Sequence, residues 1–233
     1  MENKTVSIIL PVHNEEKVLL ENVRRLERML EGVLSDFEIL ISEDGSTDRT
    51  LEVARRLRSG RIRLFHNALR QGKGAAIRIA AGEARGNTII FMDADLASDP
   101  THIREFLDLM GSGAAIVIGS RYLRESKTKR DPMRYLASRG FNLLVRVVLG
   151  SRLTDHQCGF KAFRKDLVLP LINEVQDDGW FWDTEMLVRA QRKGLKIAEV
   201  PIAWKEARGS KFRMLSDSAR MGCSLLGFKI RNG

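Results

Sequence analysis

Two hydrophobic periods alternate along the first half of the chain. Short apolar runs, typical of buried strands, occupy residues 6–12, 37–41, 62–65, 88–92 and 114–119. Segments whose apolar residues recur every three or four positions lie between them, at 16–34, 47–57, 74–84 and 100–110. Ser46 or Thr47 is expected to cap the second of these helices. The alternation predicts an α/β fold, in which a mostly parallel sheet carries helices on both faces.

The alternation ends near residue 120. Beyond it the sequence predicts a polar loop at 121–131, an amphipathic helix at 132–149, a strand at 159–163, a helix at 182–193, a strand at 197–204 and a last helix at about 215–230. The chain contains no repeat and no Pro-, Ser- or Gly-rich linker, so we expect a single domain over residues 1–233. We divide it into the alternating half 1–120, a second half 121–211 and a basic amphipathic segment 212–233.

The most informative pattern is the pair of carboxylates that follows the apolar run 88–92. Asp93 and Asp95 stand where a buried strand emerges, and the carboxyl ends of strands are where open α/β sheets bind ligands. Two hard oxygen ligands one residue apart suit Mg²⁺ or Mn²⁺, which would in turn hold a diphosphate. A solvated turn is the structural alternative for such a pair taken alone.

Polar residues also follow the other strands of this half. Glu15 comes after the first strand, Asp44 after the second, and the Gly72-Lys73-Gly74 segment after the third. Each has a structural alternative, as a helix cap or a turn glycine. Because the carboxyl ends of parallel strands share one edge of a sheet, we expect these side chains to converge with the carboxylate pair. The glycine segment could hold phosphate through backbone N–H groups and one ammonium, although it is not a P-loop.

Composition narrows the class of protein. The chain of 233 residues is 43% hydrophobic and 30% charged, which allows a packed core. Its two cysteines, Cys158 and Cys223, make no disulfide framework, so a reduced, cytosolic setting is expected. We expect neither a signal peptide nor a membrane span, since the first strand follows the N-terminus at once and no stretch approaches about 20 apolar residues.

The net charge of +9 is concentrated in two segments. Residues 121–139 and 205–233 each contain seven Lys or Arg against two acidic residues. Such segments could meet phosphate ligands, nucleic acid or an anionic membrane surface. Both are interleaved with apolar residues, and no aromatic-basic RNA-binding motif accompanies them, so we expect no nucleic-acid partner.

Several segments, in this order, resemble family 2 glycosyltransferases with a GT-A fold. They are ILPVHNEE at 9–16, EDGSTD at 43–48, GKG at 72–74, DAD at 93–95 and GSR at 119–121. The segments DHQCGFK at 155–161, GWFWDTE at 179–185 and RGSK at 208–211 resemble the dolichyl-phosphate hexosyltransferases, especially the β-glucosyltransferase branch. The resemblance implies a nucleotide-sugar-binding half at 1–120, an acceptor-side half at 121–211, and inverting transfer of a hexose to a polyprenyl (dolichyl) phosphate.

The resemblance also implies roles for single residues. Those expected at the nucleotide sugar are Pro11, His13, Glu15, Asp44, Lys73, Asp93 and Gln157. Those expected at the acceptor phosphate are Arg121, Arg134, Arg139, Ser210 and Lys211. The expected metal ligands are Asp93 and Asp95, and the catalytic candidates are Asp95, Arg121 and Asp183. In mannosyl-transferring relatives a Gln often completes the metal site two residues after the second Asp; here that position is Ala97.

The chemistry of the acceptor supports this assignment. A phosphate monoester is largely dianionic at neutral pH, so it needs positive charge to guide it more than a general base. The enzyme is expected at the cytoplasmic face of a membrane, in peripheral contact through residues 212–233. Alternatives are a GT-A enzyme that glycosylates a saccharide hydroxyl, with Asp183 as base, and a nucleotidyltransferase. Resemblance favours UDP-glucose as donor, with GDP-mannose and UDP-N-acetylhexosamine as alternatives.

Overall fold

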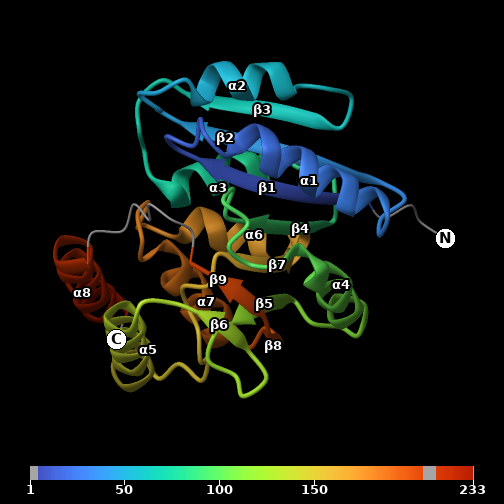
Figure 1. Ribbon diagram of the computed structural model, residues 1–233. Helices are drawn as coiled ribbons and strands as arrows, with labels where there is room; N and C mark the ends of the chain where they lie inside the picture. Colours follow the sequence, from blue (N-terminus) through green and yellow to red (C-terminus); the bar gives the residue numbers. More distant parts are fainter. Residues whose placement is uncertain (1–4, 207–213, 233) are drawn as a thin grey trace.

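The computed structural model of the chain describes residues 5–206 and 214–232 (Figure 1). Its elements, in chain order, are β1 (Val6–Val12), α1 (Leu19–Glu31), β2 (Phe37–Asp44), α2 (Thr50–Leu57), β3 (Ile62–Asn67), α3 (Lys73–Glu83), β4 (Thr88–Met92), the 3₁₀ turn η1 (Pro100–His102), α4 (Ile103–Gly111), β5 (Ile116–Ser120), β6 (Lys127–Lys129), α5 (Pro132–Leu149), β7 (Phe160–Arg164), α6 (Lys165–Glu174), α7 (Trp182–Arg192), β8 (Ile197–Pro201), β9 (Ala203–Lys205) and α8 (Met214–Asn232).

Within the described residues, seven strands form the main sheet in the order β3-β2-β1-β4-β7-β5-β8. β7 lies antiparallel to both of its neighbours, β4 and β5, and the other pairs are parallel. The expected α/β fold with a mostly parallel sheet is therefore confirmed. The carboxyl ends of β1, β2, β3 and β4 lie at one edge, as the alternation of strands and helices predicted.

Helices cover both faces of the sheet (Figure 1). Alternate strand residues point to opposite sides, so Ile8 joins the core under α1, α2 and α4, whereas Ile9 joins the core under α3, α6 and α7. Phe91 and Trp182, the latter on α7, meet edge to face in the second core, with ring centroids 5.8 Å apart. Burial on both faces explains why the central strands are continuous apolar runs.

A smaller apolar cluster joins α5, α7 and α8. It contains Val145 and Leu149 from α5, together with Phe181, Val188 and the α8 residues Leu225 and Phe228. α8 is therefore packed on the domain through its buried side, while Leu226 and Ile230 remain exposed. No helix in the described ranges is both long and apolar enough to cross a membrane.

The structure departs from the sequence prediction in four places, three of them in the second half. Residues 121–131 were expected to be a loop, but they contain β6, which pairs in parallel with β9. The single strand expected at 197–204 is divided into β8 and β9, because Ile202 N–H bonds to Ser120 and the chain then turns to β6. α6 was missed; Pro170 lies inside this helix, and proline argues against a helix from sequence alone.

The fourth difference concerns the start of α2. Neither Ser46 nor Thr47 caps this helix, which begins at Thr50. Asp48 Oδ1 instead accepts a hydrogen bond from the Thr50 N–H, 2.9 Å away. Ser46 Oγ accepts from the Asn14 N–H at 2.9 Å and so ties the β1 and β2 loops together at the edge of the sheet.

Candidate active site

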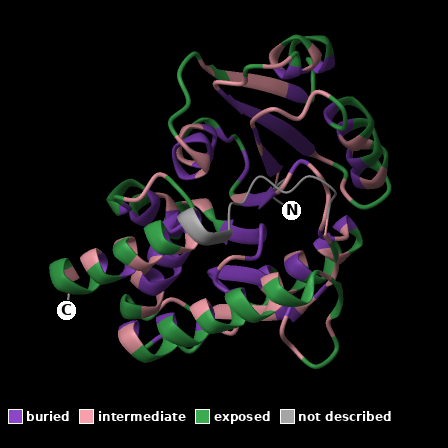
Figure 2. Ribbon diagram, turned by 60° about the vertical axis from the view of Figure 1, so that its left-hand side comes forward, coloured by how far each residue is buried: buried purple, intermediate pink, exposed green. Residues whose placement is uncertain are grey.

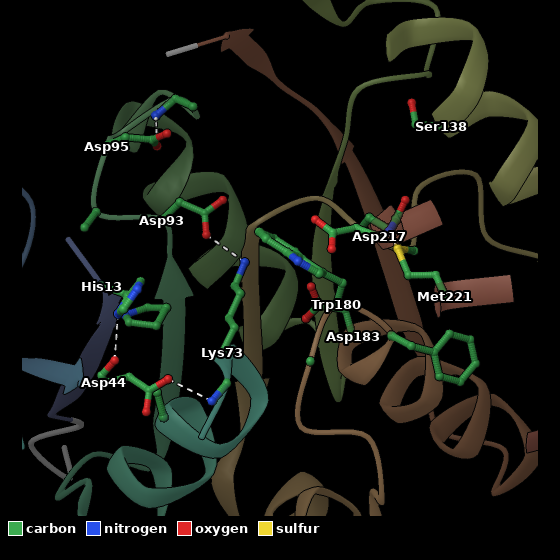
Figure 3. A pocket seen from close by; sticks show the side chains of 18 of the residues that line it. His13, Asp44, Lys73, Asp93, Asp95, Ser138, Trp180, Asp183, Asp217 and Met221 are labelled. Atoms are coloured by element: carbon green, nitrogen blue, oxygen red, sulfur yellow. Dashed lines mark hydrogen bonds and ion pairs between the residues drawn. The ribbon is translucent and has the colours of Figure 1, made fainter. Parts of the chain in front are cut away.

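A cavity of about 1250 Å³ opens at the carboxyl edge of the sheet. The ends of β1, β2 and β4 form one wall, and the loop before α7 together with α5 and α8 forms the other (Figure 3). The sheet edge therefore brings together the polar residues that follow separate strands. The residues that line the cavity divide it into two ends: a carboxylate end at β4 and an arginine end beside β5 and α5.

Four residues expected at the nucleotide line the β1–β2 side of the cavity: Pro11, His13, Glu15 and Asp44. His13 Nδ1 lies 2.8 Å from the Asp44 carbonyl oxygen. The Asp44 carboxylate accepts hydrogen bonds from the N–H groups of Gln71 and Gly72, each at 2.8 Å. Asp44 thus fixes the loop before α3 as well as lining the cavity.

That loop requires glycine at position 72. Gly72 has a φ of +117°, and a Cβ there would lie 2.2 Å from the Asp178 carbonyl oxygen. The close approach holds the 176–181 segment, which precedes α7, against the start of α3. Lys73 begins α3 and extends its side chain into the cavity.

Lys73 and Asp93 form an ion pair at the centre of the cavity, with Nζ 2.7 Å from Oδ1 (Figure 3). Burial acts to lower the pKa of Lys73, but the carboxylates of Asp93, Asp183 and Asp95 outweigh it and hold that pKa above its usual range. Asp93 also packs on Gly159, where a Cβ would lie 1.9 Å from Oδ2. Lys73 is therefore a permanent cation beside the carboxylate pair.

The surroundings of Asp95 destabilise the ionised form of its carboxylate. Burial, followed by the like charge of Asp93, raises the pKa of Asp95 to about 6, although its Oδ1 accepts a hydrogen bond from the Ala97 N–H at 3.0 Å. A cation at this position would relieve both causes. Oxygen ligands of this kind suit a hard divalent ion.

The protein offers two carboxylates here and not a complete cage. No group of three acidic, His or Cys side chains is arranged for a metal in residues 5–206 and 214–232. Ala97 lines the cavity at the position where mannosyl-transferring relatives carry Gln. The donor set fits an ion whose remaining ligands come from a bound diphosphate and water, as Mg²⁺ and its kin prefer.

Asp183, at the start of α7, lies on the opposite wall from Lys73. It is almost buried, and its Oδ1 makes no hydrogen bond but lies 3.4 Å from Nζ of Lys161, which is completely buried. Lys161 Nζ also donates to the Cys158 carbonyl oxygen. The sequence placed two tryptophans beside Asp183, but only Trp180 lines the cavity; Trp182 points into the core.

The arginine end is built around Trp204 of β9. The guanidinium carbons of Arg121 and Arg130 each lie 5.5 Å from the centroid of its ring. Arg121 is buried and forms a forked pair with Asp155, with nitrogen–oxygen distances of 2.7 and 2.8 Å. Burial alone would lower the pKa of Arg121, but Asp155 holds it above its usual range.

Arg130 differs from Arg121 in its charge environment. Within residues 5–206 and 214–232, no carboxylate forms an ion pair with Arg130, and its Nε is buried without a hydrogen-bond partner. Burial, and then the charge of Arg121, lower the pKa of Arg130. Its NH1 donates to Ser138 Oγ at 2.7 Å. Of the two guanidinium groups over the Trp204 ring, only that of Arg121 is paired with a carboxylate in the described residues, which leaves this end of the cavity favourable for an anion.

The remaining acceptor-side predictions have different outcomes. Arg134 and Gln157 line the cavity; Arg134 NH1 pairs with Glu206 at 3.0 Å. Arg139 is not among the lining residues: it is exposed and stacks on Tyr135 of its own helix. Five residues separate it from Arg134, which turns it about 140° away around α5. Ser210 and Lys211 lie outside the described residues.

Sequence reasoning missed several residues that line the cavity. Arg130 was not among the acceptor-phosphate candidates, and Trp204 was expected only as the end of the strand at 197–204. Ser138 and Phe141 come from α5, and Asp217 from α8. The only sequence signal for Arg130 was the density of arginines between 121 and 139. Its position depends on the pairing of β6 with β9, which the sequence did not indicate.

Comparison with known proteins was consistent at three levels. Residues 7–169 match the profile described as "Glycosyl transferase family 2". The chain is 41% identical over 226 residues to "Glycosyltransferase AglD" of Haloferax volcanii, covering 95% of this chain and 36% of that protein. It is 31% identical over 243 residues to "Dolichyl-phosphate beta-glucosyltransferase" of Saccharomyces cerevisiae, covering 95% of this chain and 73% of that protein.

Among solved structures, the chain is similar to glucosyl-3-phosphoglycerate synthase from Mycobacterium tuberculosis. That structure is a complex with Mn²⁺, uridine diphosphate and glucosyl-3-phosphoglycerate. The TM-score is 0.72 at 21% sequence identity, covering 97% of this chain and 80% of that chain. At this identity the likeness establishes a shared fold.

Proposed function

The chain belongs to glycosyl transferase family 2 and has the GT-A fold, and on this basis we propose that it transfers a hexose from a nucleotide sugar to a polyprenyl phosphate. We propose UDP-glucose as the donor and a β-linked lipid-phosphate sugar as the product. The names of the relatives support this choice, since a yeast protein that is 31% identical over 95% of this chain is named a dolichyl-phosphate β-glucosyltransferase. The solved neighbour with uridine diphosphate supports a uridine donor.

One observation carries the proposal: the cavity has a carboxylate end and an arginine end, and these suit two phosphorylated molecules. At the first end, the Asp93–Asp95 pair stands beside the Lys73 ammonium. At the second end, Arg121 and Arg130 lie over the ring of Trp204, and in the described residues only Arg121 is paired with a carboxylate, that of Asp155. A diphosphate donor fits the first end and a phosphate acceptor fits the second.

At the donor end, Asp93 and Asp95 would hold Mg²⁺ or Mn²⁺. When bound, the ion would neutralise the charge that develops on the departing nucleoside diphosphate. The protein's own contribution is Lys73, whose ammonium stays protonated among three carboxylates and can pair with a phosphate oxygen. Pro11, His13, Glu15 and Asp44 would line the nucleoside site.

At the acceptor end, we assign phosphate binding to Arg121, Arg130 and Arg134. Arg130 can hold phosphate by forked hydrogen bonds, which would orient one oxygen toward the sugar. Arg121, whose Nε and NH2 already bond to Asp155, would contribute its positive charge and its remaining NH1 group. That oxygen is already ionised and needs no base. It attacks the anomeric carbon, the bond to the diphosphate breaks with its electron pair leaving on the diphosphate oxygen, and an α-linked donor gives a β-linked product.

Asp183 is assigned to the donor sugar and not to proton removal. Its carboxylate is almost buried, with the Lys161 ammonium 3.4 Å away, and it lines the cavity between the two ends. A carboxylate that is paired in this way is suited to accept hydrogen bonds from sugar hydroxyls. Gln157, also in the cavity wall, is assigned to the same sugar.

The isoprenoid chain of the proposed acceptor resides in a membrane, so the reaction would take place at a membrane surface. We propose that the enzyme works in peripheral contact with a membrane, at its cytoplasmic face. The basic segments support contact with an anionic surface. The two cysteines, neither of them in a disulfide, are compatible with a reducing compartment.

The test is transfer of labelled sugar into organic solvent. Purified protein, Mn²⁺ and a polyprenyl phosphate are incubated with UDP-glucose, GDP-mannose or UDP-N-acetylglucosamine in turn. The proposal expects UDP-glucose to give the largest amount of organic-extractable label. Label that appears only on added saccharides would establish the alternative, a transferase that glycosylates a hydroxyl, and would overturn the proposal.

A further inference from the structure

α5 presents a continuous apolar face that no other described part of the chain covers (Figure 2). Met133, Leu136, Leu143, Leu144 and Val147 are between 44% and 75% exposed. We call these five residues the α5 stripe. With about 100° of rotation per residue, they fall within one sector of about 100° along the whole helix. Scattered exposed apolar residues are normal, but a contiguous stripe of this kind marks an interaction surface.

The stripe lies next to the side of α5 that faces the cavity. Arg134, Ala137, Ser138 and Phe141 line the cavity, and on the same helical wheel they fall in the sector that borders the stripe. Ala137 stands between the two sectors. An apolar chain that leaves the arginine end of the cavity past Phe141 would therefore reach the stripe directly.

The arginines of α5 indicate which kind of partner the α5 stripe would contact. The helix contains Arg134, Arg139 and Arg146 and no acidic residue. Arg139 and Arg146, both exposed, fall on the flank of the stripe that is away from the cavity. Two copies of this face would bring like charges together, whereas an anionic lipid surface would pair with the arginines and cover the apolar side chains.

We propose that the α5 stripe is the surface by which this enzyme docks on an anionic bilayer, with the mouth of the cavity held at the lipid headgroups. This rests on the proposed function, because it explains how a lipid-borne phosphate reaches the arginine end. It differs from the sequence expectation, which assigned membrane contact to residues 212–233. In α8 the apolar residues Met221, Leu225 and Phe228 are buried, and its exposed apolar residues, Leu226 and Ile230, make a smaller patch than the five residues of the α5 stripe.

Co-sedimentation with vesicles tests the docking surface. The vesicles contain phosphatidylcholine mixed with phosphatidylserine and no polyprenyl phosphate. The variant Leu136→Gln/Leu143→Gln/Val147→Gln should lose binding by about tenfold per substitution, since each removes a largely exposed side chain from the lipid contact. Arg146→Gln should weaken binding about fivefold, and only when phosphatidylserine is present. Glutamine is a good helix former, so α5 should remain folded.

A matched control uses an exposed leucine on the other side of the molecule. Leu20→Gln, on α1, makes the same change at a residue that is 53% exposed and should bind vesicles like the unmodified protein. The stripe variant should also keep normal transfer to a short, water-soluble polyprenyl phosphate, because none of its three positions lines the cavity.

Two results would overturn the docking surface. One is equal vesicle binding by the stripe variant and the unmodified protein. The other is a dimer that becomes a monomer in the stripe variant, which would show that the stripe covers a second copy of the chain. Failure of the proposed function looks different: no protein, modified or not, would transfer sugar to any polyprenyl phosphate, whatever its vesicle binding.

Discussion

Replacing Asp95 with asparagine should abolish transfer and at the same time stabilise the fold. The carboxylate is destabilising in the metal-free protein, because burial and the charge of Asp93 raise its pKa from an ordinary value of 3.8 to about 6. The asparagine side chain can keep the hydrogen bond from the Ala97 N–H through its amide oxygen. It removes the buried charge and, with it, half of the proposed metal site.

The structure sets the size and the pH range of the effect. A difference between 3.8 and about 6 corresponds to about 3 kcal/mol. Asp95 is half-buried and its charge is screened by solvent, so we expect about 1 to 1.5 kcal/mol. The folded pKa lies above the unfolded one, so the penalty is absent below about pH 4 and complete above about pH 6. The advantage of Asp95→Asn should therefore appear as pH rises through this window.

Urea unfolding in the presence of a chelator measures this effect. The midpoint of Asp95→Asn should exceed that of the unmodified protein at about pH 8 and equal it near pH 4. Asp99→Asn is the matched control, for which the change in stability should have the opposite sign. Burial acts to raise the pKa of Asp99, but hydrogen bonds from Thr101 hold that pKa below its usual value. Its ionised form is therefore stabilising, and the substitution should lower stability. A less stable Asp95→Asn at about pH 8, or near-normal turnover, would refute the reasoning.

Three further substitutions probe the rest of the cavity. Lys161→Met should destabilise the fold by about 3 kcal/mol, because it leaves the Asp183 carboxylate without the buried Lys161 ammonium. In urea unfolding, the double variant Lys161→Met/Asp183→Asn should recover most of this loss. Additive losses of stability would refute the pairing. Arg130→Gln should raise the KM for polyprenyl phosphate about tenfold or more while leaving hydrolysis of the nucleotide sugar unchanged. An equal loss of affinity for the nucleotide sugar would show that Arg130 does not act specifically on the acceptor. Gly159→Ala should displace Asp93, since the added Cβ would lie 1.9 Å from Oδ2, and isothermal titration should show weakened Mn²⁺ binding in the presence of nucleotide; unchanged binding would contradict that contact.

The sequence was most informative where a single strand determined the local structure. The apolar run before Asp93 predicted a buried strand with the carboxylate pair at the edge of the sheet, and the pairing of β4 with β1 and β7 confirms the strand. The same reasoning placed Glu15, Asp44 and Lys73 beside it, and the structure places all of them in one cavity. The individual roles of these residues stay predictions.

The arginine end could not be predicted in the same detail, because long-range pairing determines it. Arg130 reaches the cavity only because β6 pairs with β9 and brings Trp204 beneath it. The sequence favoured Arg139 instead, although the helical rotation from Arg134 turns it away. Helix α6 was missed because Pro170 opposes a helix locally, while burial of Val168, Leu171 and Ile172 compensates in the folded protein.

The central claim is that the arginine end accepts a phosphate and not a hydroxyl. A matched pair of acceptors tests it most directly: a polyprenyl phosphate and the polyprenol of the same chain length, each with UDP-glucose and Mn²⁺. We expect transfer to the polyprenyl phosphate alone, with one uridine diphosphate released for each β-linked product. Equal transfer to the polyprenol, or transfer to neither lipid alongside transfer to a saccharide, would contradict the account.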